Sequence, residues 1–143
     1  MNPRAIEMQV TDLSVDPSTE LPVVILRAIK GDSIFSLTVG ALEAKSIRAE
    51  LTRMSLERPM THDLINDILD KCGHSIERIE IARCARHEYA ATLHLLGECG
   101  TRRQVEARPS DALAVAVRGR APIYVCLELL EQLPDGPASQ WKM

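Results

Sequence analysis

The sequence has few aromatic residues and no excess of positive charge. Aromatic residues make up 3% of its 143 residues, so the core must be aliphatic, and a platform of exposed rings for stacked nucleobases is disfavoured. The chain has 17 basic and 20 acidic residues, which gives a formal net charge of −3. A protein that neutralises many phosphates usually shows a basic excess. The composition therefore neither supports nor excludes a nucleic acid bound weakly through a local basic cleft.

The sequence also lacks paired cysteine motifs and long apolar runs. Its cysteines, Cys72, Cys84, Cys99 and Cys126, form no Cys-x-x-Cys unit, so a structural zinc site is not expected. Reduced thiols in the cytoplasm are the simplest interpretation. No apolar signal segment opens the chain, and no run approaches the roughly 18 apolar residues that span a bilayer. We therefore expect a cytoplasmic protein without a membrane segment.

The remaining composition is typical of a globular domain. Apolar residues make up 45% and charged residues 26%, and a chain of this length can bury a sizeable core. Without a linker or a strong internal repeat, we expect a single domain over residues 1–133. Turn-forming residues cluster from Pro134 to Ser139, so residues 134–143 are expected to form a disordered tail.

Hydrophobic periodicity predicts an alternation of strand groups and helices. Strands are expected at about 5–13, 23–28, 33–39, 79–81, 89–95, 102–107 and 123–125, and helices at 41–55, 61–72, 110–118 and 127–133. A turn at Arg86-His87 predicts an antiparallel hairpin. The order β-β-β-α-α-β-β-β-α-β-α favours an α+β (mixed α/β) fold, with a mixed, largely antiparallel sheet and about four helices.

The helices are expected to bury regular apolar stripes. The predicted stripe of the first helix is Ala44, Ile47, Leu51 and Met54, and that of the second is Leu64, Ile65, Ile68, Leu69 and Cys72. The third helix is apolar on all sides from Ala112 to Val117, so it is expected to be buried on most of them.

Two similar segments each place an Arg-Pro pair before a predicted helix. They read RPMTHDL at residues 58–64 and EARPSDA at residues 106–112. Thr61 and Ser110 stand where an N-cap hydroxyl would accept a bond from the first turn. Asp63 and Asp111 lie in those first turns, where the helix dipole favours negative charge. On a structural interpretation, the segments are two capped helices, each with its acid paired to an arginine.

The same segments allow a catalytic interpretation. A helix N-terminus presents free N–H groups to an anion, and Arg58 and Arg108 would add bidentate phosphate contacts. Asp63 and Asp111 would hold a divalent metal that activates water, with His62 as a proton shuttle. Such parts make a phosphodiester hydrolase if the two segments meet in space. Glu43, offset from the buried stripe of the first helix, is a further candidate metal ligand.

At these residues the sequence resembles the bifunctional nuclease family, also called the DNase/RNase domain. The likeness rests on RPMTHDL, on EARPSDALAVAVR at residues 106–118, on a Gly-x-x-Glu-Ala core at 40–44 and on PIYV at 122–125. It implies a mixed α/β domain that self-associates as a homo-oligomer. It also implies a nuclease that acts on DNA and RNA.

The resemblance assigns site residues by position. They are Glu43, Arg58, Thr61, His62, Asp63, Arg108, Ser110 and Asp111. The carboxylates among them would hold Mg²⁺ or Mn²⁺, and the arginines and hydroxyls would bind the substrate. Glu106 departs from the family pattern, which often has Asp there, so its carboxylate is displaced by one methylene.

Two hypotheses therefore stand side by side. The first is a metal-assisted nuclease of DNA and RNA. The second is a non-catalytic, oligomeric binding or regulatory module, in which the Arg-Pro segments are structural or bind a small anionic ligand. The position of Asp63 and Asp111 discriminates between them, because a shared pocket favours the nuclease and burial of each acid against an arginine favours the module.

Overall fold

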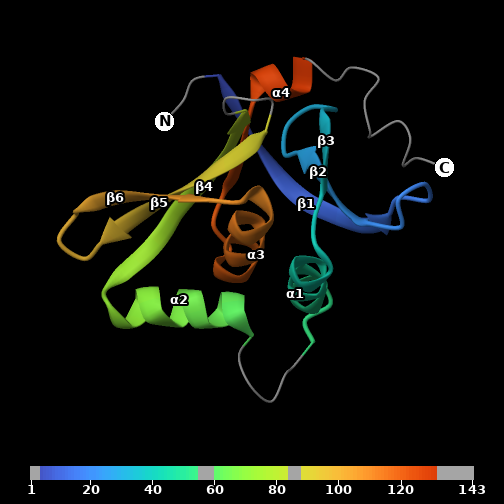
Figure 1. Cartoon of the computed structure of the whole chain (residues 1–143). Helices are drawn as coiled ribbons and strands as arrows, with labels where there is room; N and C mark the ends of the chain where they lie inside the picture. The colour runs from blue at the N-terminus through green and yellow to red at the C-terminus, as the bar shows by residue number, and fades with distance from the viewer. Residues whose placement is uncertain (1–3, 55–59, 84–87, 132–143) are drawn as a thin grey trace.

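The computed structural model describes residues 4–54, 60–83 and 88–131, which form a mixed sheet with helices packed on it (Figure 1). The elements are β1 (Ala5–Val15), β2 (Pro22–Ala28), β3 (Ile34–Thr38), α1 (Ala41–Leu51), α2 (Thr61–Lys71), β4 (His74–Arg83), β5 (Tyr89–Gly97), β6 (Arg102–Ala107), α3 (Pro109–Gly119), β7 (Ile123–Cys126) and α4 (Leu127–Glu131). This order confirms the α+β fold predicted from the sequence. The expected turn at Arg86-His87 and the expected tail at 134–143 lie outside the described residues.

The strands of the described part form one seven-stranded sheet in the order β3-β2-β1-β7-β4-β5-β6. Five of the six neighbouring pairs are antiparallel, and only β4 and β7 run parallel. The four-residue β7 lies between β1 and β4, so it joins an N-terminal half of the sheet to a C-terminal half. Ile123 pairs with Met8 on one side and Ile79 on the other.

The core is aliphatic, as the scarcity of aromatic residues requires. Residues 112–116 of α3 are at most 1% exposed, because this helix packs against the sheet and against both α1 and α2. Ile47 of α1 and Ile79, Ile81 and Val125 of the sheet are fully buried in the same cluster. The expected burial of α3 on most sides is therefore confirmed. No helix in the described part of the chain is long and apolar enough to cross a membrane.

Helix α1 is shorter than predicted. It ends at Leu51, and Arg53 adopts a left-handed conformation with φ of 52° that brings the Met54 N–H to the Ala49 carbonyl. Leu51 and Met54 are consequently 41% and 58% exposed. The prediction that both belong to the buried stripe was wrong, because the chain turns away before a further helical turn forms.

The predicted apolar stripe of helix α2 is only partly buried. Ile65 and Leu69 pack against the core as predicted, whereas Leu64 and Ile68 are more than half exposed and Cys72 is exposed beyond the last turn. The fully buried residue of the helix is His62, and the Asn66 amide donates a hydrogen bond to the Val115 carbonyl of α3. These polar contacts rotate the helix away from Leu64 and Ile68, and apolar periodicity alone does not record them.

The predicted N-caps were also wrong. The cap positions are Met60 before α2 and Arg108 before α3, so Thr61 is the first residue of α2 and Ser110 lies in the first turn of α3. Pro109 occupies the first helical position of α3, where its fixed φ and missing N–H cost nothing. At α2 the Asp63 carboxylate accepts a 2.9 Å hydrogen bond from the Met60 N–H, which satisfies the N–H of the cap residue itself.

The buried guanidinium of Arg118 joins the three central helices. It lies on α3 with 5% of its side chain exposed and forms an ion pair with Asp63 of α2. Its Nη1 donates to both the carbonyl and the hydroxyl oxygen of Ser46 on α1, at 2.8 and 2.6 Å. A buried guanidinium is stable only when its donors are satisfied, so this residue requires α1 and α2 to lie in their observed positions.

We expect Arg118→Met to lower the free energy of unfolding by about 3 kcal/mol, because it removes one partner of a buried ion pair and leaves Ser46 and Asp63 uncompensated. Urea unfolding followed by circular dichroism measures the change. Arg48→Met is the matched control, since Arg48 is exposed on α1. Equal losses in the two variants would contradict this role of Arg118.

Candidate functional site

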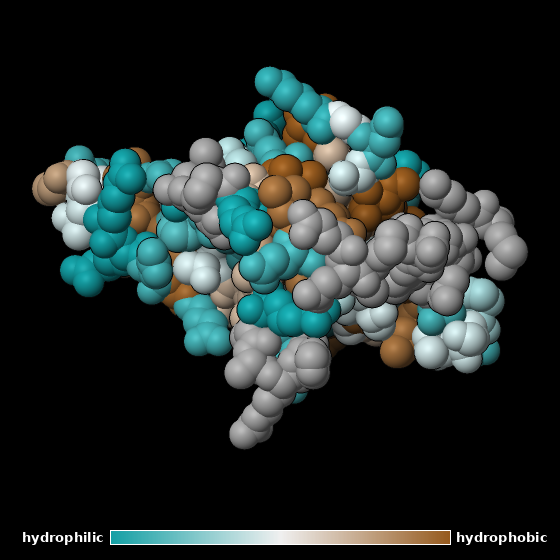
Figure 2. Space-filling view, turned by 90° about the horizontal axis from the view of Figure 1, so that it is seen from above, coloured by the Kyte–Doolittle hydropathy of each residue, from teal (hydrophilic) through white to brown (hydrophobic). Residues whose placement is uncertain are grey.

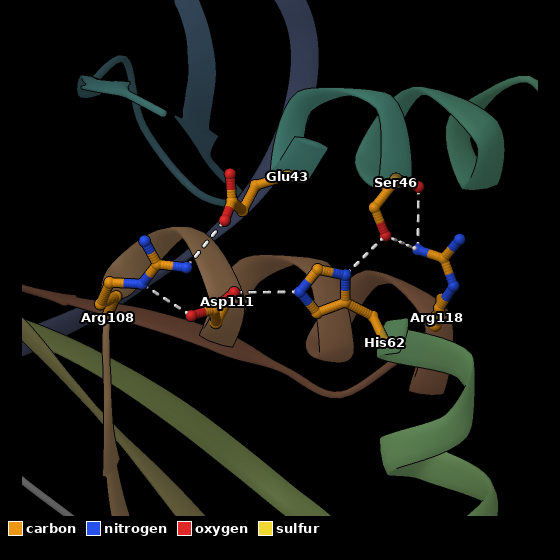
Figure 3. Close-up of polar contacts among 6 residues, drawn as sticks. All are labelled: Glu43, Ser46, His62, Arg108, Asp111 and Arg118. Carbon is orange, nitrogen blue, oxygen red and sulfur yellow. Dashed lines mark hydrogen bonds and ion pairs between the residues drawn. The ribbon is translucent and has the colours of Figure 1, made fainter. Parts of the chain in front are cut away.

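A chain of hydrogen bonds and ion pairs crosses the junction of α1, α2 and α3 (Figure 3). In order from the buried end to the surface, its members are Arg118, Ser46, His62, Asp111, Arg108 and Glu43. The two Arg-Pro segments do therefore meet, because His62 belongs to the first, Asp111 belongs to the second, and the two side chains bond with each other. Each helix contributes residues from the turns that face the other two.

The buried end of the chain is formed by Ser46 and His62. Ser46 has no exposed surface, and its Oγ lies 2.8 Å from Nδ1 of His62. The His62 Nε2 lies 3.0 Å from Oδ1 of Asp111. Both ring nitrogens are therefore engaged, and His62 is only 7% exposed.

The hydrogen-bond donors assign the protonation pattern of this relay. A guanidinium only donates, so Ser46 Oγ accepts a hydrogen bond from Arg118, and the same hydroxyl bonds with Nδ1 of His62. The ionised Asp111 carboxylate only accepts, so Nε2 of His62 carries a proton and donates it to Asp111. Asp111 thus fixes the proton on Nε2 of the histidine.

Asp111 is the point where the buried relay reaches the surface. Partial burial by itself raises its pKa, but hydrogen bonds from Arg108 and His62, together with the charge of Arg108, outweigh that effect. The pKa of Asp111 consequently lies below its ordinary value of 3.8. The carboxylate is therefore ionised throughout the neutral range, with 32% of the side chain exposed.

The exposed end of the chain is a guanidinium between two carboxylates. Arg108 donates from Nε to Asp111 at 2.8 Å and from Nη2 to Glu43 at 2.7 Å. The hydrogen bond with Asp111, and then the bond with Glu43, raise the pKa of Arg108, so this group stays positive. Its side chain is 69% exposed, whereas that of Glu43 is 12% exposed.

A glycine lets the Glu43 carboxylate adopt this position. Gly40 is the N-cap of α1, and Glu43 lies in the first turn, where the helix dipole favours its charge. A Cβ atom at position 40 would overlap Oε2 of Glu43. The glycine and the glutamate of the Gly-x-x-Glu core are therefore linked by direct packing.

Asp63 lies at the other end of the relay from Asp111. It is held by Arg118 and by the Met60 N–H, and so serves as a structural partner of a buried cation. The two aspartates predicted to share a metal thus pair with different arginines. Among the residues that the structure describes, no group of three or more His, Cys, Asp or Glu side chains is placed to hold a metal ion.

The other sequence-predicted residues have separate positions. Thr61 is exposed at the first residue of α2, and Ser110 is buried in the first turn of α3. Glu106 is exposed on β6. Arg58 lies outside the described residues.

The Ser46–His62–Asp111 order resembles a nucleophilic triad, but burial excludes that chemistry. The hydroxyl of Ser46 has no exposed surface in which to meet a substrate, and it already bonds with Arg118 and His62. What reaches solvent is the carboxylate of Asp111 and the guanidinium of Arg108. The arrangement can therefore bind an anion at Arg108 and present an oriented carboxylate beside it.

Sequence reasoning missed Ser46 and Arg118. Ser46 interrupts the apolar face of α1 next to Ile47, and Arg118 ends the apolar run of α3. A polar residue that continues a buried face was the available signal in both helices. It predicts a buried polar contact but does not identify the partner.

We expect Asp111→Asn to destabilise the fold at neutral pH by about 1 kcal/mol, because it weakens charge-assisted bonds with His62 and Arg108. Since the folded pKa of Asp111 is lowered, its stabilising contribution is present above the unfolded value and is lost as the pH falls below 3.8. Urea unfolding midpoints should therefore differ at neutral pH and converge below 3.8. Asp67→Asn, at an exposed position of α2, is the control. A difference that is constant with pH would refute the linkage.

Comparisons with known proteins agree with this arrangement. The family described as the bifunctional nuclease domain matches residues 24–134. An uncharacterized protein of Mycobacterium tuberculosis is 34% identical over 133 residues, which covers 90% of this chain and 79% of that protein. Bifunctional nuclease 1 of Arabidopsis thaliana is 28% identical over 73% of this chain, and bifunctional nuclease 2 of Oryza sativa subsp. japonica is 24% identical over 87%. The match covers 33% and 39% of these two plant proteins. The chain therefore belongs to the bifunctional nuclease domain family.

Proposed function

We propose that the protein hydrolyses phosphodiester bonds of DNA and RNA at the surface formed by Arg108, Asp111 and Glu43. The observation that carries the proposal is the exposed guanidinium of Arg108, which two carboxylates hold at the N-terminus of α3. A cation beside free helix N–H groups is well suited to a phosphate. Family membership and the names of the plant relatives support the same activity.

In this proposal each exposed group has a distinct task. Catalysis of phosphoryl transfer consists mainly of positioning and of stabilising negative charge. Arg108 binds the phosphate and stabilises the charge that develops on its oxygens. Asp111 accepts a hydrogen bond from the attacking water and orients it. Because the pKa of Asp111 is lowered, the carboxylate orients water better than it removes a proton from it.

His62 acts through Asp111 in this scheme. Its ring is buried, and both nitrogens bond with protein groups, so it touches neither the phosphate nor the water. It fixes the direction of the Asp111 carboxylate, and its bond with the Ser46 hydroxyl holds the ring in place. His62 is therefore a positioning residue, in place of the direct proton shuttle expected from the sequence.

Dependence on Mg²⁺ or Mn²⁺ stays a prediction. Asp63 is committed to Arg118, and Glu43 and Asp111 are bridged by the guanidinium of Arg108. The carboxylates of Glu43 and Asp111 do not fit a metal cation while the positively charged guanidinium of Arg108 lies between them.

A non-catalytic module that binds a small anionic ligand at Arg108 is the alternative. The structural role of Asp63 favours it, because the ion pair with Arg118 makes one of the two signature acids part of the scaffold. Both proposals place an anion at Arg108. They differ in whether cleavage follows binding.

We expect Arg108→Ala and Asp111→Asn to lower kcat/KM for cleavage of single-stranded DNA and RNA by about 100-fold, the usual loss when one stabilising group is removed. Fluorescent oligonucleotides, with added Mg²⁺, Mn²⁺ or chelator, give the rates. Arg27→Ala, an exposed arginine on β2, is the matched control and should retain wild-type activity.

Equal rates for the wild type and both site variants would indicate a contaminating nuclease and would refute the proposed site. Binding of oligonucleotide without cleavage, under every metal condition, would favour the non-catalytic module. A rate that is insensitive to chelator would refute the predicted metal dependence alone.

A further inference from the structure

The strand that leads into the candidate site is exposed along its length. Strand β6 is at one end of the described sheet, pairs only with β5, and exposes every residue from Arg102 to Glu106. Figure 1 shows β6 running from the tip of the β4–β5–β6 arm to the start of α3. Hydrophilic side chains gather over this arm in the view of Figure 2. In the part of the chain that the structure describes, no helix packs extensively against β6.

A groove of about 350 Å³ lies on the arm and is rich in positive charge. Its lining is Glu77, Arg78, His94, Leu95, Arg102, Arg103 and Gln104. Three arginines therefore face one carboxylate, in a chain with 17 basic and 20 acidic residues. This local excess is the basic cleft that the overall composition left open.

The charges of the groove are unequally available to a ligand. Arg78 bonds with Glu77 and Glu80, and only 15% of its side chain is exposed, so little of it is accessible to a ligand. Arg102 is 72% exposed and reaches Glu77 only at 3.7 Å, and Arg103 is also exposed. Arg102 and Arg103, as consecutive residues of β6, point to opposite faces of this edge strand, so a ligand that lies along its outer edge can meet both guanidinium groups.

His94 contributes a neutral ring to the lining of the groove. Its Nε2 is buried, has no hydrogen-bond partner in the described part of the chain and lies 3.5 Å from Glu80. Burial, and then the charge of Arg78, lower its pKa, so the ring is neutral at neutral pH. The ring therefore adds no charge to the groove, and the exposed arginines supply the positive charge.

We propose that one strand of nucleic acid lies along β6, with its phosphates against Arg102 and Arg103 at the outer end and against Arg108 at the inner end. Six residue steps at about 3.3 Å separate Arg102 from Arg108, which gives a track of about 20 Å. Such a track spans several nucleotides. The inference rests on the proposed function, since Arg108 is the phosphate-binding group of that site.

The chemistry of the track predicts how it selects its ligand. Its lining contains no Phe, Tyr or Trp ring on which a base would stack, and its exposed side chains are Arg102, Arg103 and Gln104. Contacts to phosphates position a strand without reading its bases. The track therefore binds polynucleotides of different sequence with similar affinity and extends substrate binding away from the point of cleavage.

Salt-dependent binding tests the track. Fluorescence anisotropy with labelled single strands of about twelve nucleotides, within the usual 4–16-nucleotide site size, gives the affinity at several salt concentrations. The variant Arg102→Ala/Arg103→Ala should bind roughly tenfold more weakly, and the slope of log K against log salt should fall by about 1.4 for two lost phosphate contacts. In this variant, lengthening the ligand from a dinucleotide to the strand of about twelve nucleotides should increase the affinity less than it does in the wild type.

The control is Arg27→Ala/Arg48→Ala, which removes the same charge from exposed positions on β2 and α1. Urea unfolding establishes that both double variants are folded. Equal slopes in the two double variants, or a wild type that does not bind the strand, would overturn the track. A wild type that binds with the expected slopes but does not cleave would overturn the nuclease proposal and leave the track in place.

Discussion

The guanidinium of Arg118 is buried, and a buried cation must have partners for all of its donors. Those partners come from two other helices, Asp63 on α2 and Ser46 on α1. The requirement that stabilises the helix junction also positions the site, because Ser46 accepts from Arg118 and bonds with Nδ1 of His62. Stability and site geometry are therefore one network here, and a change at its buried end reaches the exposed carboxylate of Asp111.

Much of the fold could be predicted because it depends on local periodicity. The order of strands and helices and the burial of α3 follow from apolar patterns that each segment carries by itself. The exposed face of α2 could not be predicted in this way. Its orientation depends on Asn66 bonding with the Val115 carbonyl and on Asp63 pairing with Arg118, and these are contacts between segments far apart in the sequence.

The candidate site, like the fold, could be predicted from the sequence only in part. Glu43, Arg108 and Asp111 belong to recognisable segments, and the structure brings them together with His62. The equivalence of Asp63 and Asp111, which the two similar segments indicate, does not hold in space. One pairs with a buried arginine and the other with an exposed one, so the same local pattern supports a scaffold in α2 and an open surface in α3.

The position of β7 has a consequence for the order of folding. Strands β1, β2 and β3 form one antiparallel group, and β4, β5 and β6 form another. Within each group, paired strands follow each other directly along the chain. In the described sheet, β7 joins the two groups, because it hydrogen-bonds with β1 of the first and with β4 of the second. It is also synthesised after both groups. The hydrogen-bonded sheet therefore becomes continuous only when residues 123–126 have been synthesised, and the pairing of this strand is a long-range step of folding.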